Sequence, residues 1–193
     1  MKIATPRGDA MVERFEPKGK PRLLLALGHG AGGGVDAPDL VAVREAALAN
    51  KVAVAMVTQP YRVAGRRAPA PAPALDEAWL AVMAALKPKV PLVVGGRSSG
   101  ARVACRTAAL SKAVGIVALA FPLHAPGKPE KSRASELLTG VPTLVVNGDS
   151  DPFGVPSPTK GVQVTIIPGA RHDLRKDLNA VTAAVVTFLS SLG

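Results

Sequence analysis

Short apolar runs, separated by stretches with helical periodicity, constrain the fold of this chain more than any other feature of its sequence. Most of the later runs are continuously apolar rather than alternating, which is typical of parallel strands covered on both faces. Repeated alternation of such strands with helices predicts a doubly wound α/β domain with right-handed crossovers. The expected strands are Ala10–Phe15, Leu23–Leu27, Val52–Val57, Leu92–Val94, Val114–Ala120, Thr143–Asn147 and Val162–Ile167.

The segments between these runs carry helical patterns. One of them places Trp79, Val82 and Leu86 on a single face, and the stretch before it, "APAPAP", favours a stiff, extended surface loop. At 193 residues, we expect one domain over residues 1–193, with a sheet of about six or seven strands. The expected helices are Asp39–Asn50, Leu75–Leu86, Ser99–Leu110, Lys131–Leu138 and Leu178–Leu192.

The chain is strongly basic, with a formal net charge of +10, which raises the question of a nucleic-acid partner. The lysines and arginines are scattered singly or in pairs, without a continuous basic block. Aromatic residues make up only 3% of the chain, so platforms for base stacking are scarce. Both observations argue against nucleic-acid binding.

Cysteine usage and hydropathy bear on the cellular compartment. The one cysteine, Cys105, excludes an internal disulfide and a cysteine-based zinc site. No apolar run approaches the roughly 20 residues of a membrane helix, and the first residues, "MKIATPRGDAMVERF", lack the apolar segment of a secretory signal. We therefore expect a cytoplasmic protein without a membrane partner.

A serine stands between two glycines at the junction of an apolar run and an alanine-rich stretch, in "VVGGRSSGARVAC". A serine on a sharp strand-to-helix turn has strained backbone angles, and Gly96 and Gly100 avoid collisions with neighbouring strands. Ser98 is therefore a candidate nucleophile. Because glycine and serine are common residues, the motif alone is equally compatible with Ser98 or Ser99 acting only as a helix N-cap.

A second glycine-rich stretch, "LGHGAGGG", follows the apolar run Leu23–Leu27. Such a loop brings backbone N–H groups close to an anion, and with the residue after a nucleophile it forms an oxyanion hole. The expected donors are Ala31, or alternatively Gly32, and Ser99. The glycine spacing also fits a dinucleotide fingerprint, but the next strand ends in "VTQPY" without an acidic residue, and the chain has no P-loop. The oxyanion interpretation is therefore favoured.

A carboxylate and an imidazole follow the candidate nucleophile at the ends of later strands. In "NGDSDPFG", Asp149 and Asp151 compete for the role of the acid. We prefer Asp151 for its Gly-x-x-Asp arrangement, whereas Asp149 suits a hydrogen bond to the loop backbone. In "GARHDL", His172 stands where Ser98 needs a general base. Serine, aspartate and histidine thus follow the chain order found with the nucleophile elbow of α/β-hydrolases.

Four further residues are expected near the substrate. His29 belongs to the oxyanion loop and is expected to brace it, and Gly32 lies in the same loop. Arg97 adjoins the nucleophile, and His124 follows a middle strand, where it is placed to line the pocket. This chemistry implies neither a cofactor nor a metal.

These stretches resemble the small α/β-hydrolases related to dienelactone hydrolases. They resemble more closely a little-characterised group of predicted hydrolases that includes a subunit of the eukaryotic NSL chromatin complex. The resemblance implies an α/β-hydrolase fold with Ser98, Asp151 and His172 as the triad. Dienelactone hydrolases carry cysteine where this chain has Ser98, so lactone specificity is not implied. The resembling segments are "LGHGAGGGVDAPDL", "GGRSSGARVA", "FPLHAPGKPEK", "NGDSDPFG" and "PGARHDL".

The sequence therefore predicts a lidless serine hydrolase that cleaves a carboxylic ester, or alternatively a thioester or amide. The segment between Phe121 and Val141 is too short for a cap domain. The rival interpretation is a binding or scaffold protein that keeps a relic triad on the same fold. The basic residues after two of the strands form either a solvated surface or a positive rim that favours anionic substrates. They are Arg62, Arg66, Arg67, Lys128, Lys131 and Arg133.

Overall fold

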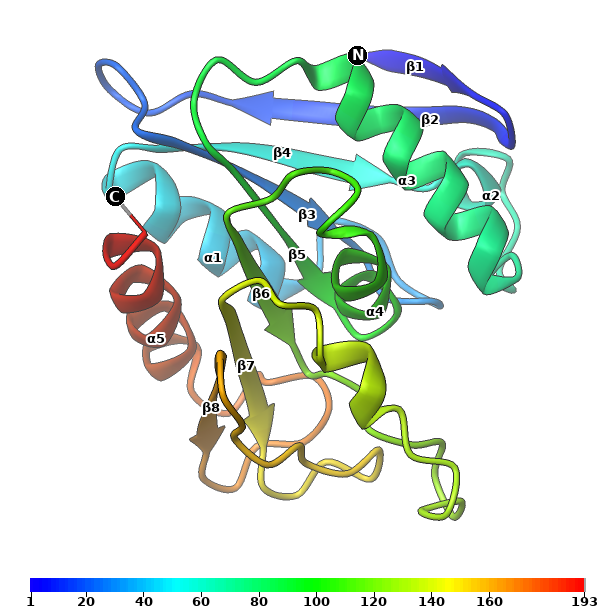
Figure 1. Cartoon of the computed structure of the whole chain (residues 1–193), viewed down its shortest axis with the longest axis vertical. Helices are drawn as coiled ribbons and strands as arrows, with labels where there is room; N and C mark the ends of the chain where they lie inside the picture. The colour runs from blue at the N-terminus through cyan, green and yellow to red at the C-terminus, as the bar shows by residue number, and fades with distance from the viewer. Residues whose placement is uncertain (193) are drawn as a thin grey trace.

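The computed structural model describes residues 1–192, and its centre is an eight-stranded sheet in the order β1-β2-β4-β3-β5-β6-β7-β8 (Figure 1). Strands β3 to β8 are parallel to one another, whereas β2 pairs antiparallel with β4 and β1 pairs antiparallel with β2. The predicted doubly wound, mostly parallel α/β fold is confirmed. The strands are β1 Lys2–Thr5, β2 Gly8–Phe15, β3 Leu23–Gly28, β4 Val52–Thr58, β5 Leu92–Arg97, β6 Gly115–Leu119, β7 Thr143–Gly148 and β8 Val162–Ile167.

The sheet has one strand more than the largest number predicted. The additional strand is β1, which pairs with β2 in a register that sets Lys2 opposite Met11 and Ile3 opposite Ala10. Its four residues, "KIAT", contain only one large apolar side chain, so no apolar run announces the strand. Burial of Ile3 against the core fixes β1 at the sheet edge.

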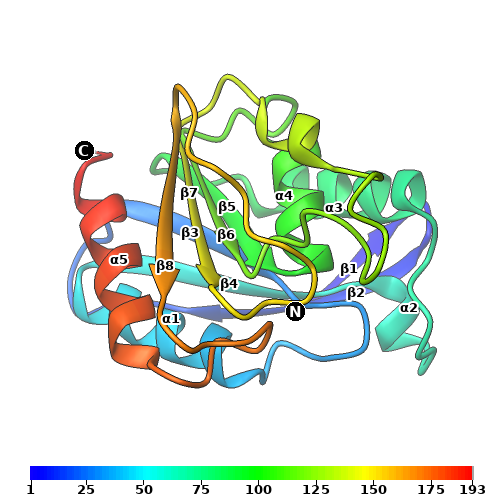
Figure 2. The same cartoon turned by 90° about the horizontal axis from the view of Figure 1, so that it is seen from below.

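Helices cover both faces of the sheet. Figure 2 shows α1 and α5 on one side of it and α3 and α4 on the other. Beneath α3 and α4 lies a core that includes Trp79 and Phe121, and beneath α1 and α5 lies a core that includes Leu40 and Phe188. Burial from both faces explains why the central strands are continuously apolar. The helices are α1 Pro38–Ala49, α2 Pro60–Val63, α3 Ala72–Leu86, α4 Ser99–Thr107 and α5 Leu178–Ser190, with a 3₁₀ turn, η1, at Ala134–Leu137.

Four helical segments differ from the prediction. Helix α3 begins at Ala72, inside the stretch predicted to be extended, because proline is tolerated in a first helical turn, where no intrahelical N–H bond is lost. The helix predicted over Lys131–Leu138 is wrong, since only the short turn η1 forms there. The short helix α2 was not predicted, and α4 ends at Thr107 rather than Leu110.

The carboxyl edge of the parallel strands carries no cap domain. The segment from residue 120 to residue 142, between β6 and β7, contains η1 as its only helix, as expected from its length. Loops from β3, β5, β7 and β8 therefore meet at an open edge, where ligands of open α/β sheets bind. Within residues 1–192, none of the helices has the length and apolarity needed to cross a membrane.

Candidate active site

Ser98 occupies the sharp turn between β5 and α4. Its backbone angles, φ 53° and ψ −110°, lie outside the regions that L-residues favour, as expected for a serine in a nucleophile elbow. Although Ser98 is at the N-cap position of α4, its side chain makes no capping hydrogen bond. Its Oγ lies instead 2.9 Å from Nε2 of His172. The alternative that Ser98 serves only as a helix cap is therefore wrong.

Two glycines make this turn possible. A Cβ atom added at Gly96 would lie 2.5 Å from the carbonyl oxygen of Gly28, at the end of β3. A Cβ atom added at Gly100 would collide with the same carbonyl group. The elbow thus packs directly against the end of the neighbouring strand, which excludes any side chain at both positions.

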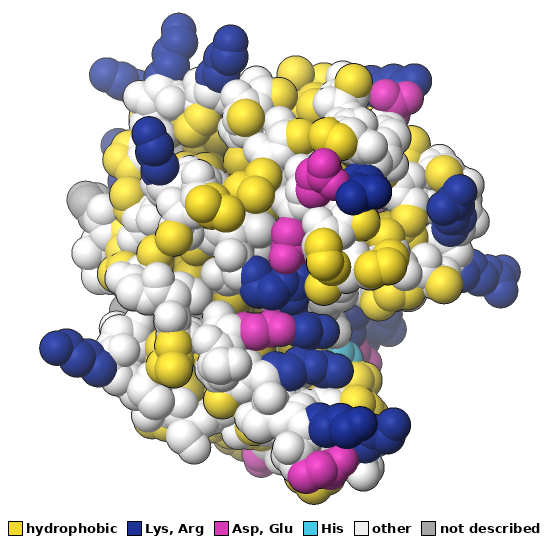
Figure 3. All heavy atoms as spheres, turned by 45° about the vertical axis from the view of Figure 1, so that its right-hand side comes forward, with side chains coloured by type: hydrophobic (Ala, Val, Ile, Leu, Met, Phe, Trp, Pro, Cys, Tyr) yellow, Lys and Arg dark blue, Asp and Glu magenta, His cyan; other side chains and the backbone are white. Residues whose placement is uncertain are grey.

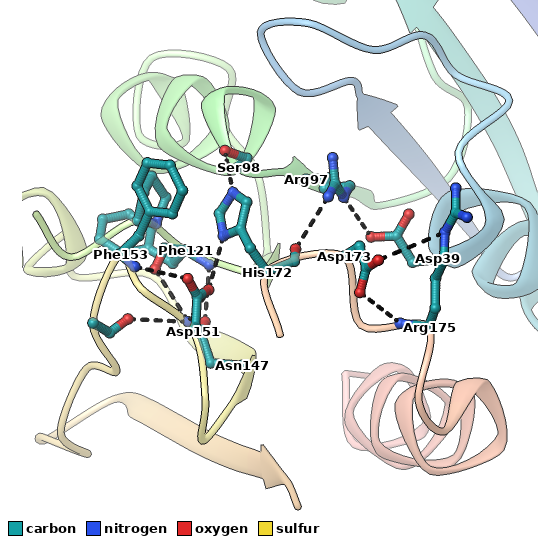
Figure 4. Close-up of polar contacts among 12 residues, drawn as sticks. Asp39, Arg97, Ser98, Phe121, Asn147, Asp151, Phe153, His172, Asp173 and Arg175 are labelled. Atoms are coloured by element: carbon teal, nitrogen blue, oxygen red, sulfur yellow. Dashed lines mark hydrogen bonds and ion pairs between the residues drawn. The ribbon is translucent and has the colours of Figure 1, made fainter. Parts of the chain in front are cut away.

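His172 links the serine to a buried carboxylate (Figure 4). Nδ1 of His172 lies 2.8 Å from Oδ2 of Asp151, whose side chain is fully buried. The second carboxylate oxygen, Oδ1, accepts a hydrogen bond of 2.8 Å from the backbone N–H of Phe153. The Phe153 ring also stacks on the imidazole, with centroids 4.2 Å apart. The three residues predicted as a triad therefore meet with the geometry that proton transfer from the serine requires.

Asn147, which sequence reasoning did not identify, holds the carboxylate in place. It is the penultimate residue of β7, and its amide Nδ2 lies 3.3 Å from Oδ2 of Asp151. Its Oδ1 accepts a hydrogen bond of 2.8 Å from the N–H of Phe121. Its sequence signal is a polar side chain ending an apolar strand, in "LVVNG".

Asp149, the other candidate for the acid, has a different role. Its Oδ1 accepts a hydrogen bond of 2.9 Å from the backbone N–H of Gly169, and it also contacts the hydroxyl of Ser150. Asp149 is exposed, whereas Asp151 is buried. The alternative considered for Asp149, a bond to the loop backbone, is the one that forms.

The loop after β3 lies beside the elbow. A Cβ atom added at Gly30 would lie 3.6 Å from Cβ of Ser98, whereas one added at Gly32 would meet open space. Ser99 is the first residue of α4, where an N–H has no intrahelical partner. Within residues 1–192, neither the Ala31 N–H nor the Ser99 N–H donates a hydrogen bond. The two segments beside the nucleophile thus each contain one N–H group without a hydrogen-bond partner.

Comparison with known proteins agrees with this geometry. A family model described as an alpha/beta hydrolase domain matches residues 20–183 of the sequence. The chain belongs to the α/β-hydrolase family.

Solved structures show the fold shared by this hydrolase. An α/β serine hydrolase without a lid from Xanthomonas campestris superposes with a TM-score of 0.81 at 17% identity, over 99% of this chain and 93% of that one. An α/β serine hydrolase homologue from Coxiella burnetii gives 0.81 at 19% identity, over 98% and 96% of the two chains. Est1E from Butyrivibrio proteoclasticus gives 0.80 at 19% identity, over 100% and 98%. No curated protein matches the sequence.

His29 braces the loop beside the elbow of this α/β-hydrolase. Its Nε2 accepts a hydrogen bond of 3.1 Å from the N–H of Gln59, so the proton is on Nδ1, which donates to the carbonyl of Gly30 at 2.8 Å. Burial lowers the pKa of His29, which favours this neutral form. His29 therefore has the bracing role that the sequence predicts. The predicted position next to the substrate is not supported, because the side chain is buried and both ring nitrogens are engaged.

Arg97 and His124 also differ from the expected substrate contacts. Nη2 of Arg97 donates to the carbonyl of His172 at 3.1 Å, and Nε pairs with Asp39 at 3.0 Å. His124 contacts the carbonyl of Ala125 through Nδ1, and its ring lies against Gly154 in the loop that follows Asp151. Both side chains therefore support loops of the site.

The structure bears on the two alternatives for the basic residues, a solvated surface and a positive rim. Arg133 donates to the carbonyl of Pro122 at 3.1 Å, while Arg66 and Arg67 are exposed. Figure 3 shows Lys and Arg side chains spread over one face and interspersed with acidic ones, rather than gathered in one patch.

Among residues 1–192, no group of three His, Cys, Asp or Glu side chains is arranged to hold a metal ion. The thiol of Cys105 is buried, and burial raises its pKa to about 12. The thiol therefore stays protonated at neutral pH and is a poor nucleophile.

Proposed function

We propose that this α/β-hydrolase is a serine esterase that cleaves a carboxylic ester, with Ser98 as the nucleophile, His172 as the general base and Asp151 as the residue that orients it. One observation carries the proposal. The strained serine, the imidazole and the buried carboxylate form a continuous chain with contacts of 2.9 Å and 2.8 Å. Among common enzyme chemistries, this arrangement suits acyl transfer through a covalent acyl-enzyme.

The reaction follows from the position of each group. Nε2 of His172 takes the proton of Ser98 as Oγ attacks the carbonyl carbon, and the bond from Asp151 stabilises the imidazolium. The N–H groups of Ala31 and Ser99 stabilise the negative charge on the carbonyl oxygen. Collapse of the tetrahedral intermediate expels the alcohol, which takes the proton from His172. Water, activated by the same imidazole, then attacks the acyl-enzyme and releases the acid.

The open edge supports a substrate that reaches the serine without the movement of a lid. Est1E, whose fold this chain shares, is known in a complex with ferulic acid. An ester is therefore our first choice, and a thioester or an amide is the alternative within the same mechanism. The resemblance to dienelactone hydrolases does not change this choice, because the nucleophile here is a serine.

An anionic substrate is the finer proposal. A cavity of about 540 Å³ is lined by Tyr61 and Arg66, and the Tyr61 hydroxyl donates to the carbonyl of Ala31 at 2.8 Å. Arg66 is exposed and lines the same cavity as Tyr61, which is our ground for proposing that its guanidinium binds a carboxylate or phosphate on the substrate. Arg97 and Arg133 do not contribute, since both are engaged within the fold.

The proposed cellular setting rests on cysteine usage and on the distribution of charge. We propose that residues 1–193 act as one domain in the cytoplasm. The single cysteine, which is buried, supports a reducing compartment. The scattered basic residues support a small-molecule partner over a nucleic acid.

Hydrolysis of short p-nitrophenyl esters tests the function. The wild-type protein should turn these esters over, and Ser98→Ala should lose on the order of 10⁴-fold or more in kcat while its Tm stays close to that of the wild type. Full activity in Ser98→Ala would reject the nucleophile. A wild-type protein without activity on esters, thioesters or amides would instead favour the rival interpretation, a binding protein with a relic triad.

A further inference from the structure

A single guanidinium connects three parts of the site that are distant in the sequence (Figure 4). Arg97 immediately precedes the nucleophile, at the end of β5. It contacts Asp39 on α1 and the backbone of His172 in the loop after β8. We propose that Arg97 and Asp39 form a positioning pair that holds the general base and the oxyanion loop in register with Ser98. The inference rests on the proposed function and adds residues that act through the triad.

The carboxylate of the pair is deeply buried. Asp39 lies in the first turn of α1 and is 0% exposed, and its Oδ1 accepts a hydrogen bond of 2.9 Å from the N–H of Leu40. Its Oδ2 lies 3.0 Å from Nε of Arg97, an ion pair without hydrogen-bond alignment. Burial raises the pKa of Asp39, and the charge of Arg97 opposes this shift. A buried carboxylate needs such a partner to remain charged.

The guanidinium touches both loops that the mechanism uses. Nη2 donates to the carbonyl oxygen of His172 at 3.1 Å, which fixes the backbone of the base. On the other side, a Cβ atom added at Gly30 would lie 3.2 Å from Nη1, so the guanidinium packs closely against the residue before Ala31. The same side chain therefore sets the position of the imidazole and of a proposed oxyanion donor.

A cavity beside the positioning pair gives the His172 loop room to move unless a side chain holds it. A cavity of about 250 Å³ borders Arg97 and Asp39 and is also lined by Gly33, Asp173 and Arg175. The loop that carries His172 therefore borders this cavity through Asp173 and Arg175 and has room to move when Arg97 is removed. A displacement of about 1 Å at a catalytic group can cost about 100-fold in rate.

Charge-neutral and charge-conserving variants separate positioning from folding. Arg97→Gln alone leaves Asp39 buried without a partner, so the test variant is the double substitution Arg97→Gln with Asp39→Asn, which removes both charges. We expect kcat on p-nitrophenyl esters to fall by about 10- to 100-fold, with KM within about 3-fold of the wild type. The rate of labelling by a fluorophosphonate should fall in parallel. Arg97→Lys keeps the charge but not the two-sided contact, so it should restore part of the rate.

A second ion pair provides the control, although its carboxylate is less buried than Asp39 and its arginine also contacts Glu136. Arg106 on α4 pairs with Asp76 on α3 through contacts of 2.7 Å and 2.6 Å, and their side chains are 19% and 22% exposed. Neither residue contacts the His172 loop. The double substitution Arg106→Gln with Asp76→Asn should lower Tm while leaving kcat and the labelling rate unchanged.

The outcomes distinguish this inference from the proposed function. A folded Arg97/Asp39 double variant with wild-type kcat would overturn the inference alone, as would an equal loss of kcat in the Arg106/Asp76 control. If the wild-type protein were no more active than Ser98→Ala, the proposed function would fail, and the inference would fail with it. Loss of kcat confined to the Arg97/Asp39 variant, with partial rescue by Arg97→Lys, would establish the positioning pair.

Discussion

Oγ of Ser98 lies 2.9 Å from Nε2 of His172, although 74 positions separate the two residues in the sequence. The topology of the sheet accounts for this proximity. Ser98 follows β5 and His172 follows β8, and β5 to β8 are consecutive parallel strands whose carboxyl ends lie along one edge. The loop after β8 needs only to extend back along that edge to bring the imidazole to the elbow.

The two aspartates after β7 should differ sharply in their effect on catalysis. Asp151→Asn should lower kcat by roughly 10⁴-fold, because an amide no longer enforces the tautomer of His172 that accepts the serine proton. Asp149→Asn should change kcat only slightly, because its carboxylate contacts Gly169 and Ser150 rather than the base. Steady-state kinetics of both variants on one ester decide the matter, and the reverse ranking would reassign the acid.

Tyr61→Phe should weaken catalysis without unfolding the protein. The substitution removes the hydroxyl that donates to the carbonyl of Ala31 at 2.8 Å and keeps the ring that packs beside His29. Loss of one hydrogen bond of about 1 kcal/mol predicts a decrease in kcat of roughly 5-fold. Paired measurements of kcat and Tm test this effect. An unchanged kcat would show that the Tyr61 hydroxyl does not hold the oxyanion loop.

Glu136 should contribute stability that disappears in acid. Burial alone would raise the pKa of Glu136, but hydrogen bonds and charge from Arg102 and Arg106 outweigh it and hold the pKa below its ordinary value of 4.5. A lowered pKa in the folded state gives stability that is present above pH 4.5 and is lost as the pH falls through the folded-state value. Glu136→Gln should therefore be less stable than the wild type by about 1–3 kcal/mol at pH 7.

Urea unfolding of both proteins at pH 7, 5 and 3 measures this difference. The gap between the wild type and Glu136→Gln should narrow below pH 4.5. A gap that is constant with pH would mean that the carboxylate charge contributes nothing to stability.

Substrate charge should matter if Arg66 and Arg67 face the bound ester. An ester with a free carboxylate should then have a higher kcat/KM than its neutral analogue. Added salt should reduce this advantage, because the Debye length falls from about 30 Å at 0.01 M to about 8 Å at 0.15 M. Replacing both arginines with glutamine should remove part of the advantage and leave kcat on neutral esters unchanged. Equal kcat/KM values for the charged and the neutral ester at low salt would show that Arg66 and Arg67 do not take part in substrate recognition.

The sequence was sufficient to predict the parts of this fold and site that depend on local pattern. Continuously apolar runs identify the buried strands, and Ser98, Asp151 and His172 are recognisable because each follows a strand in a defined order. The helix predicted over Lys131–Leu138 forms only as the 3₁₀ turn Ala134–Leu137, and the strand Lys2–Thr5 was missed because it is too short to show periodicity.

Contacts between segments that are distant in the sequence could not be predicted. Asn147 could not be paired with Phe121, 26 positions away, without knowing that the two lie on adjacent strand ends. Arg97 was expected at the substrate because it adjoins the nucleophile, but its guanidinium is engaged by Asp39 and by the carbonyl of His172. Its partner Asp39 is part of an ordinary helix start, and only the packing of α1 against the elbow brings the two charges together.

Covalent labelling of Ser98 tests the central claim most directly. The wild-type protein would be treated with a fluorophosphonate, and its intact mass and the modified peptide would be determined by mass spectrometry. We predict one adduct per chain, on Ser98, formed rapidly by the folded protein, abolished by heat denaturation and strongly slowed in His172→Ala. A labelled Ser99, or a folded protein that remains unlabelled at high reagent concentration, would contradict the assignment of Ser98 as an activated nucleophile.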